Sequence, residues 1–308
     1  GLHHRAVLHA DPEQPVSVET ASAERPVWSK SQVSALRECR RKLFFTVRSG
    51  GSDPILATAA AMKKIRGRHL WAGAVLHETI GDILKRVRQG ELAEDVETVV
   101  DRLKTRMRDE FRASKEGKTE SPLFEHRYNA PVTPDAWRRQ WENVETSVRW
   151  FLASKWLTRL SALGPECWKA VDEVLSFDVN GIKAYSKIDC AVEIDGKFFV
   201  IDWRGSAPTA QAEAGLQVAA LYAHENWGAD PESLQVMSVS LLDGAAYHAT
   251  VTEDSLMETH LRIEEEATEL QQAAAKLGDA PFAIPLADFG TCRRCSFQGL
   301  CHPKGLPA

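Results

Sequence analysis

The chain has 308 residues, of which 44% are hydrophobic and 26% charged, with a net charge of −5 and a pI near 6.1. This balance excludes a strongly basic protein that coats nucleic acid, and a chain of this length can bury a full core. No apolar run approaches the roughly 18 residues of a membrane span, and the N-terminus lacks the apolar segment of a signal peptide. We therefore expect a soluble, cytoplasmic protein with no membrane partner.

The first residues differ in character from the rest of the chain. Residues 1–27 contain several prolines and no hydrophobic periodicity, so we predict a flexible arm ahead of a single domain over residues 28–308. A helix is predicted from Ser29 to Phe45, because a capping serine is followed by apolar residues at helical spacing. The basic residues of this helix are candidates for phosphate contacts, with a solvated helix face as the alternative. They are Arg40, Arg41 and Lys42.

Amphipathic helices are predicted next, because apolar residues recur at a period near 3.6. They cover residues 69–87, residues 91–111 and a third segment that begins at Thr133. His77 lies beside the apolar stripe of the first, and Gly73, one turn earlier, leaves room for a close neighbour. The later helices predict a helical insertion over residues 91–166.

From residue 170 the pattern changes to strands. A strand is predicted over residues 171–179, followed by a hairpin of residues 185–194 and 197–204 joined by Asp195-Gly196, a strong turn signal. A helix over residues 208–225 and a second hairpin around Asp243-Gly244 follow. A long helix capped by Thr252 then ends near Gly278.

Each strand of the first hairpin places one carboxylate inside an apolar run: Asp189 and Asp202. Burying a lone carboxylate costs several kcal/mol without a cation, and oxygen ligands suit Mg²⁺ or Mn²⁺. Residues two apart on a strand share a face, so Lys187 accompanies Asp189 and Arg204 accompanies Asp202. Such a cluster can bind a phosphodiester, its metal ion and an attacking water. The alternative is that cross-strand salt bridges neutralise the acids.

The tail of the chain carries a second metal signal. Cys292, Cys295 and Cys301 have the spacing C-x2-C-x5-C, which brings thiolates around one centre. The tail alone is one ligand short of four. The candidates for the fourth ligand are Cys39, Cys167, Cys190 and His302.

Taken in order, these pieces resemble the PD-(D/E)XK nuclease superfamily. The matched pieces are Cys39 ahead of an aromatic pair, Gly73-x3-His77, Asp189, Ile201-Asp202-Trp203-Arg204-Gly205, Gln217 with Tyr222, and the terminal cysteines. Within the superfamily the chain resembles the RecB-like branch with an iron–sulfur cluster, which includes the CRISPR-adaptation exonucleases and the nuclease domain of AddB-type recombination subunits. The resemblance covers about residues 28–303.

The resemblance implies an α/β fold with a restriction-endonuclease-like core: a central mixed β-sheet flanked by helices, with a cluster-binding tail at residues 289–303. It implies that Mn²⁺ or Mg²⁺ is held by His77, Asp189, Asp202 and the main-chain carbonyl of Trp203. It also implies a [4Fe-4S] cluster on Cys39, Cys292, Cys295 and Cys301, with zinc as the competing metal. Gln217 and Tyr222 would contact the nucleic acid. Cys167 and Cys190 stay unassigned.

The sequence departs from the family pattern at two places. Arg204 stands where the family has lysine, and arginine cannot release a proton near neutral pH. Gln217 and Tyr222 are five residues apart, where four are expected.

Two interpretations of Arg204 follow. Lys187 replaces the missing lysine, which leaves a metal-dependent deoxyribonuclease that acts on single strands or ends, with a helicase, recombination or CRISPR-adaptation partner. Alternatively, the site is degenerate and the protein binds nucleic acid or a partner without cutting. A third, less favoured function is a cluster that serves as a redox or sensing centre.

Overall fold

The computed structural model describes residues 26–206 and 210–306. The predicted arm therefore lies outside the described residues except for its last two. Of these, Val27 belongs to a short strand, β1 (Val27–Trp28), that pairs in parallel with β3. Val27, the last residue of the predicted arm, is thus part of the sheet.

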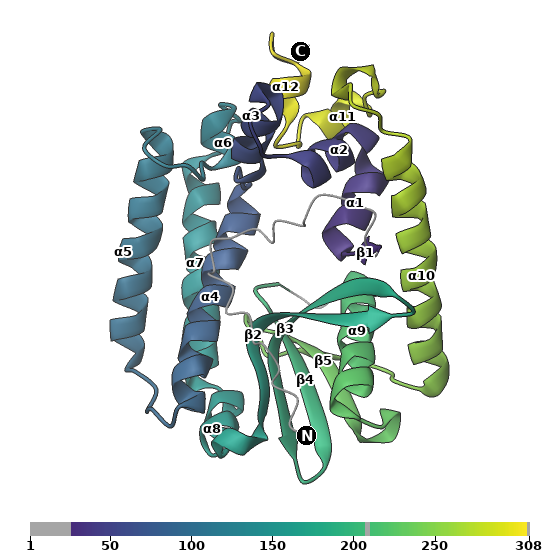
Figure 1. The fold of residues 1–308 in the computed structure, drawn as a ribbon. Helices are drawn as coiled ribbons and strands as arrows, with labels where there is room; N and C mark the ends of the chain where they lie inside the picture. The colour runs from purple at the N-terminus through teal and green to yellow at the C-terminus, as the bar shows by residue number, and fades with distance from the viewer. Residues whose placement is uncertain (1–25, 207–209, 307–308) are drawn as a thin grey trace.

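A mixed sheet of six strands forms the centre of the described part (Figure 1). Besides β1, the strands are β2 (Trp168–Val179), β3 (Ile182–Ile194), β4 (Lys197–Arg204), β5 (Leu234–Ser240) and β6 (Ala246–Ala249). The strand order is β1-β3-β4-β5-β6, with β2 paired to β3. The pairs β1–β3 and β4–β5 are parallel and the others antiparallel. This confirms the predicted α/β fold with a mixed central sheet, and both predicted hairpins.

Helices cover the sheet on both sides. They are α1 (Lys30–Glu38), α2 (Arg40–Arg48), α3 (Pro54–Lys63), α4 (Arg68–Arg88), α5 (Val96–Lys115), α6 (Phe124–Arg127), α7 (Pro134–Ala153), α8 (Lys155–Ser161), α9 (Ala210–Trp227), α10 (Glu253–Ala275), α11 (Phe289–Cys292) and α12 (Gln298–Cys301). Figure 1 shows α4, α5 and α7 side by side, with α9 and α10 on the opposite flank. None of the described helices is long and apolar enough to cross a membrane.

The sheet separates two hydrophobic cores. On β4, Val200 packs into the core shared with α9 and α10, whereas Ile201 and Trp203 pack into the core under α4 and α7. Trp203 is 1% exposed and meets Phe151 of α7 edge-on at 5.2 Å between ring centroids. The predicted helical insertion therefore supplies one wall of the second core.

The predicted helix from Ser29 to Phe45 is divided in two at Cys39. The backbone of Cys39 is extended, with φ −167° and ψ 125°, so it ends α1 and begins α2. Its N–H donates to the carbonyl of Ala35, and its carbonyl accepts from the N–H of Leu43. The resulting bend lets α2 bury Phe45 against Phe297 of the tail, at 5.4 Å between ring centroids.

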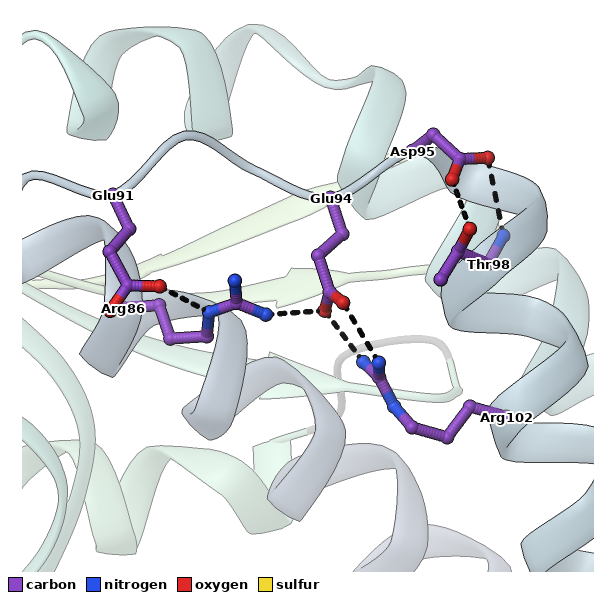
Figure 2. Close-up of polar contacts among 6 residues, drawn as sticks. All are labelled: Arg86, Glu91, Glu94, Asp95, Thr98 and Arg102. Atoms are coloured by element: carbon purple, nitrogen blue, oxygen red, sulfur yellow. Dashed lines mark hydrogen bonds and ion pairs between the residues drawn. The ribbon is translucent and has the colours of Figure 1, made fainter.

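Charged side chains fasten the connection between α4 and α5 (Figure 2). Arg86 of α4 contacts Glu91 at 2.7 Å and Glu94 at 2.6 Å, and Arg102 of α5 holds both oxygens of Glu94. These contacts lower the pKa of Glu94 to about 2, and the hydrogen bonds from Arg102 have the largest effect. Glu94 thus stays charged over the whole physiological range and links the end of α4 to α5.

Two glycines of α4 differ in their surroundings. A Cβ atom on Gly81 would lie 2.9 Å from both Cβ and Oδ2 of Asp172 on β2. A Cβ on Gly73 would meet no described atom within 4 Å. The prediction of a close neighbour at Gly73 is therefore wrong for the described residues, and Gly81 is the position where the strand approaches closely.

We predict opposite effects for alanine at these two glycines. Gly73→Ala should raise the free energy of unfolding by about 0.5–1 kcal/mol, because alanine is the better helix former. Gly81→Ala should lower it below that of the wild type, because Asp172 must move to admit the methyl group. Urea unfolding followed by circular dichroism measures both. An equal gain in the two variants would contradict the close approach.

Candidate active site

The two strand acids lie where the β3–β4 pairing stops. The strands pair from Ile194–Lys197 to Cys190–Ile201, and Asp189 and Asp202 follow directly. Beyond this point β3 continues along β2, while Asp202 lies in register with Ser238 of β5. The end of the ladder leaves the two carboxylates as neighbours, as the hairpin register predicts.

His77 reaches Asp189 from α4. Its Nδ1 lies 3.1 Å from Oδ2 of Asp189, and the main-chain N–H of Trp203 donates to the same oxygen at 3.0 Å. Burial by itself raises the pKa of Asp189, but His77 and the Lys187 ammonium outweigh it and hold that pKa below the ordinary value. Burial likewise works against a charged imidazole, yet Asp189 raises the pKa of His77 above its usual value.

Asp202 has the opposite electrostatic environment. Burial and then the charge of Asp189 raise the pKa of Asp202, and the contacts with Arg204 and Ser238 offset this only in part. Both contacts use Oδ2, which accepts from Nε of Arg204 and from Oγ of Ser238 at 3.0 Å. The buried carboxylate of Asp189 and the half-buried carboxylate of Asp202 repel each other, so a cation between them would be stabilised.

The donor set suits a hard divalent ion. In their present arrangement, no three His, Cys, Asp or Glu side chains of the described residues form a group that could hold a metal ion. However, neighbouring ligands on an octahedral ion at about 2.1 Å are about 3 Å apart, which matches the 3.1 Å between His77 and Asp189. Asp202 is held by Arg204 and Ser238 instead of by this pair.

Two lysines and a further acid form a cluster beside Asp189, and the sequence singled out only one of the three, Lys187. Nζ of Lys187 lies 3.8 Å from Oδ1 of Asp189 and 3.4 Å from Oδ1 of Asp172 on β2. Nζ of Lys85 on α4 contacts the other oxygen of Asp172 at 3.1 Å. Only the strand pairing identifies Asp172, because it lies between the register pairs Val171–Cys190 and Glu173–Ile188 and so opposite Asp189.

Among the described residues, neither Asp189 nor Asp202 makes the ion pair across the strands that the alternative expects. Asp202 pairs with Arg204 of its own strand, and Asp189 with His77 of α4. The alternative of a simple cross-strand neutralisation therefore does not describe Asp189 and Asp202.

Four cysteines gather at a second place. One cavity is lined by Cys39 at the α1–α2 junction, Cys292 on α11, Cys295 between α11 and α12, and Cys301 on α12. Burial raises the pKa of the Cys295 thiol to about 11 and also raises the pKa of Cys292 and Cys301. The other candidates for the fourth position do not line this cavity: they are Cys167, Cys190 and His302. Figure 1 shows the tail beside the N-terminal helices.

The three basic residues of α2 have different environments. Arg41 is 6% exposed and donates through Nε to the carbonyl of Ile284 and through Nη2 to that of Phe282. Arg41 therefore anchors the segment that leads to the tail. Arg40 is exposed, and Lys42 pairs with Glu38 one turn earlier. The predicted phosphate contacts thus rest on Arg40 and Lys42.

Gln217 and Tyr222 of α9 are buried. Nε2 of Gln217 donates to the carbonyl of Thr250 at 2.9 Å. The ring of Tyr222 meets Phe177 and Trp227 edge-on at 5.5 and 5.2 Å between centroids. Both side chains hold α9 in the core in this structure, and their contact with nucleic acid stays a prediction.

Comparison with known proteins adds one finding to this geometry. The family model described as PD-(D/E)XK nuclease superfamily matches residues 27–302, which include both carboxylates, His77 and the four cysteines of the cavity. A search of curated proteins finds no match.

Proposed function

Because the chain belongs to the PD-(D/E)XK nuclease superfamily, we propose that it hydrolyses phosphodiester bonds of DNA with the help of Mg²⁺ or Mn²⁺. The observation that carries the proposal is the meeting of His77 with Asp189, 3.1 Å apart, beside Asp202. These side chains come from α4, β3 and β4, and together they offer one nitrogen and two carboxylates to one ion. The carbonyl of Trp203 is the fourth proposed ligand.

A divalent ion at this place supplies Lewis-acid activation of water and neutralises charge on the phosphate. The protein's own part is to hold the two acids in position. The N–H of Trp203 and the hydroxyl of Ser238 fix one oxygen of Asp189 and of Asp202, respectively. The remaining oxygens are thereby oriented before a substrate binds.

Lys187 is the proposed replacement for the lysine that Arg204 displaces. Its ammonium lies 3.8 Å from Asp189, where it can donate hydrogen bonds to the attacking water or to a phosphate oxygen. Arg204 is paired with Asp202, and a guanidinium is not a general base. We therefore assign the proton-handling role to Lys187 and a charge-stabilising role to Arg204.

We propose single-stranded DNA or duplex ends as the substrate, presented by a helicase, recombination or CRISPR-adaptation partner. The exposed Arg40, with Lys42, provides positive charge for the phosphate backbone. This charge is local, since the whole chain carries a net charge of −5. The chain is accordingly expected to grip a short stretch of DNA rather than to coat it.

The nuclease function predicts that purified protein cleaves labelled single-stranded DNA with Mn²⁺ or Mg²⁺, and that cleavage stops when a chelator is added. Asp202→Ala should reduce kcat at least about 100-fold, because it removes a metal ligand. The matched control is Asp101→Asn on the exposed face of α5, which should cleave as the wild type does. Equal cleavage by Asp202→Ala and wild type would contradict the assignment.

We further propose that Cys39, Cys292, Cys295 and Cys301 hold a [4Fe-4S] cluster. The support is that all four thiols line one cavity, although they come from opposite ends of the chain. Closing a loop of about 250 residues is entropically costly, and a bound cluster would stabilise that closure. Zinc in a four-thiolate site is the competing occupant.

A separate prediction concerns the metal content of this cavity. Protein purified without oxygen should be brown, absorb in the visible blue, and contain about four irons per chain. Cys39→Ser should lose most of the iron, whereas Cys167→Ser, outside the cavity, should keep it. A colourless protein with one zinc per chain, lost in the same variant, would replace the iron–sulfur assignment by a zinc site.

A second candidate function is a nuclease fold that binds DNA without cutting it. The observation that favours it is the ion pair between Arg204 and Asp202, which occupies a proposed metal ligand with a cation that cannot act as a base. In this case DNA binding weakens with salt and needs no divalent ion.

Arg204→Lys distinguishes the two functions. If Lys187 serves the reaction, as we propose, the wild type cleaves and this variant differs from it by less than about threefold in kcat. A wild type that binds but does not cleave, together with a variant that cleaves, would establish the degenerate site. DNA binding by fluorescence anisotropy, recorded for both proteins, controls for lost affinity.

A further inference from the structure

One face of α4 meets the strands through three residues spaced four apart. His77, Gly81 and Lys85 lie one above another, because residues four apart share a helix face. His77 contacts Asp189, whereas Gly81 and Lys85 both adjoin Asp172. The helix thus contacts two acids on neighbouring strands, Asp189 and Asp172, and the proposed function uses only Asp189.

Asp172 has an unusual backbone for a residue within a strand. Its φ is 50°, in the left-handed region that residues with a side chain rarely adopt. The carboxylate of Glu173 accepts from the N–H of Val171 at 3.2 Å, beside this irregularity. Backbones of this kind persist where surrounding contacts hold them, and they gather at functional sites.

The carboxylate of Asp172 bridges two ammonium groups, one on each oxygen. Nζ of Lys85 lies 3.1 Å from Oδ2, and Nζ of Lys187 lies 3.4 Å from Oδ1. The side chain of Lys187 is 51% exposed, and Asp189 lies farther away at 3.8 Å. A half-exposed lysine has many rotamers, so the nearer carboxylate is what restricts Lys187 to the side of Asp189.

We infer that Asp172 is a positioning residue that holds Lys187 beside Asp189, in a space that Gly81 keeps open. The inference rests on the proposed nuclease function and explains how a lysine on a different strand can serve in place of Arg204. Asp172 acts through Lys187 and does not itself contact the substrate. Lys85 takes the second oxygen and keeps the carboxylate turned toward the site.

Cleavage of single-stranded DNA tests this coupling. Asp172→Asn keeps the size and tolerates the left-handed backbone, but it removes the charge. It should lower kcat about tenfold or more and change KM less than twofold, because the lysine is misplaced while the DNA still binds. In a Lys187→Met background the same substitution should cause no further loss. An unchanged kcat in the single variant, or equal losses in both backgrounds, would overturn the inference.

A second measurement does not depend on activity. Brief acetylation followed by mass spectrometry gives the labelling of Lys187 relative to Lys197, an exposed residue of the same hairpin. Asp172→Asn and Gly81→Ala should each raise this ratio about threefold or more by releasing Lys187, whereas Asp101→Asn should leave it unchanged. Circular dichroism confirms that each variant is folded.

The two measurements distinguish a failure of the positioning role from a failure of the nuclease function. An unchanged labelling ratio in folded Asp172→Asn overturns the positioning role, whether or not the wild type cleaves DNA. A raised ratio in a protein that does not cleave leaves the contact of Asp172 with Lys187 supported and rejects the nuclease function instead. If Lys187→Met has no measurable cleavage, the labelling ratio alone decides.

Discussion

A buried carboxylate beside a half-buried one is the constraint on which the site depends. Asp189 and Asp202 follow the last pair of the β3–β4 ladder, and the charge of Asp189 raises the pKa of Asp202. Neighbouring buried anions are stable only with positive partners. The fold supplies these from three directions: His77 from α4, Lys187 from β3 and Arg204 from β4. A bound metal ion would complete the same balance.

Helix α4 supplies positive partners for the acids of the sheet. The spacing of His77, Gly81 and Lys85 lets one helix face meet Asp189 and Asp172 on adjacent strands. The helix lies on a core that includes Trp203, the residue between Asp202 and Arg204. The contacts of Glu94 beyond the end of α4 link it to α5. Packing and charge therefore fix the same helix that presents the imidazole.

The tail and the N-terminal helices form a second junction. Arg41 binds the carbonyls of Phe282 and Ile284, Phe45 packs on Phe297, and Cys39 meets the terminal cysteines around one cavity. Contacts between such distant segments overcome the entropy of closing a long loop. This junction is held by ordinary packing and hydrogen bonds, to which a metal centre would add.

The sequence by itself determined the elements whose causes are local. Asp195-Gly196 set the first hairpin and hence the proximity of Asp189 to Asp202, Thr252 set the start of α10, and the spacing of the terminal cysteines marked the cavity. Only the tertiary structure decided that Cys39 interrupts a helix, that Arg41 is buried, and that Asp172 faces Asp189 across β2 and β3. The last two depend on contacts between separate segments of the chain, and local propensity does not indicate which distant residue a side chain contacts.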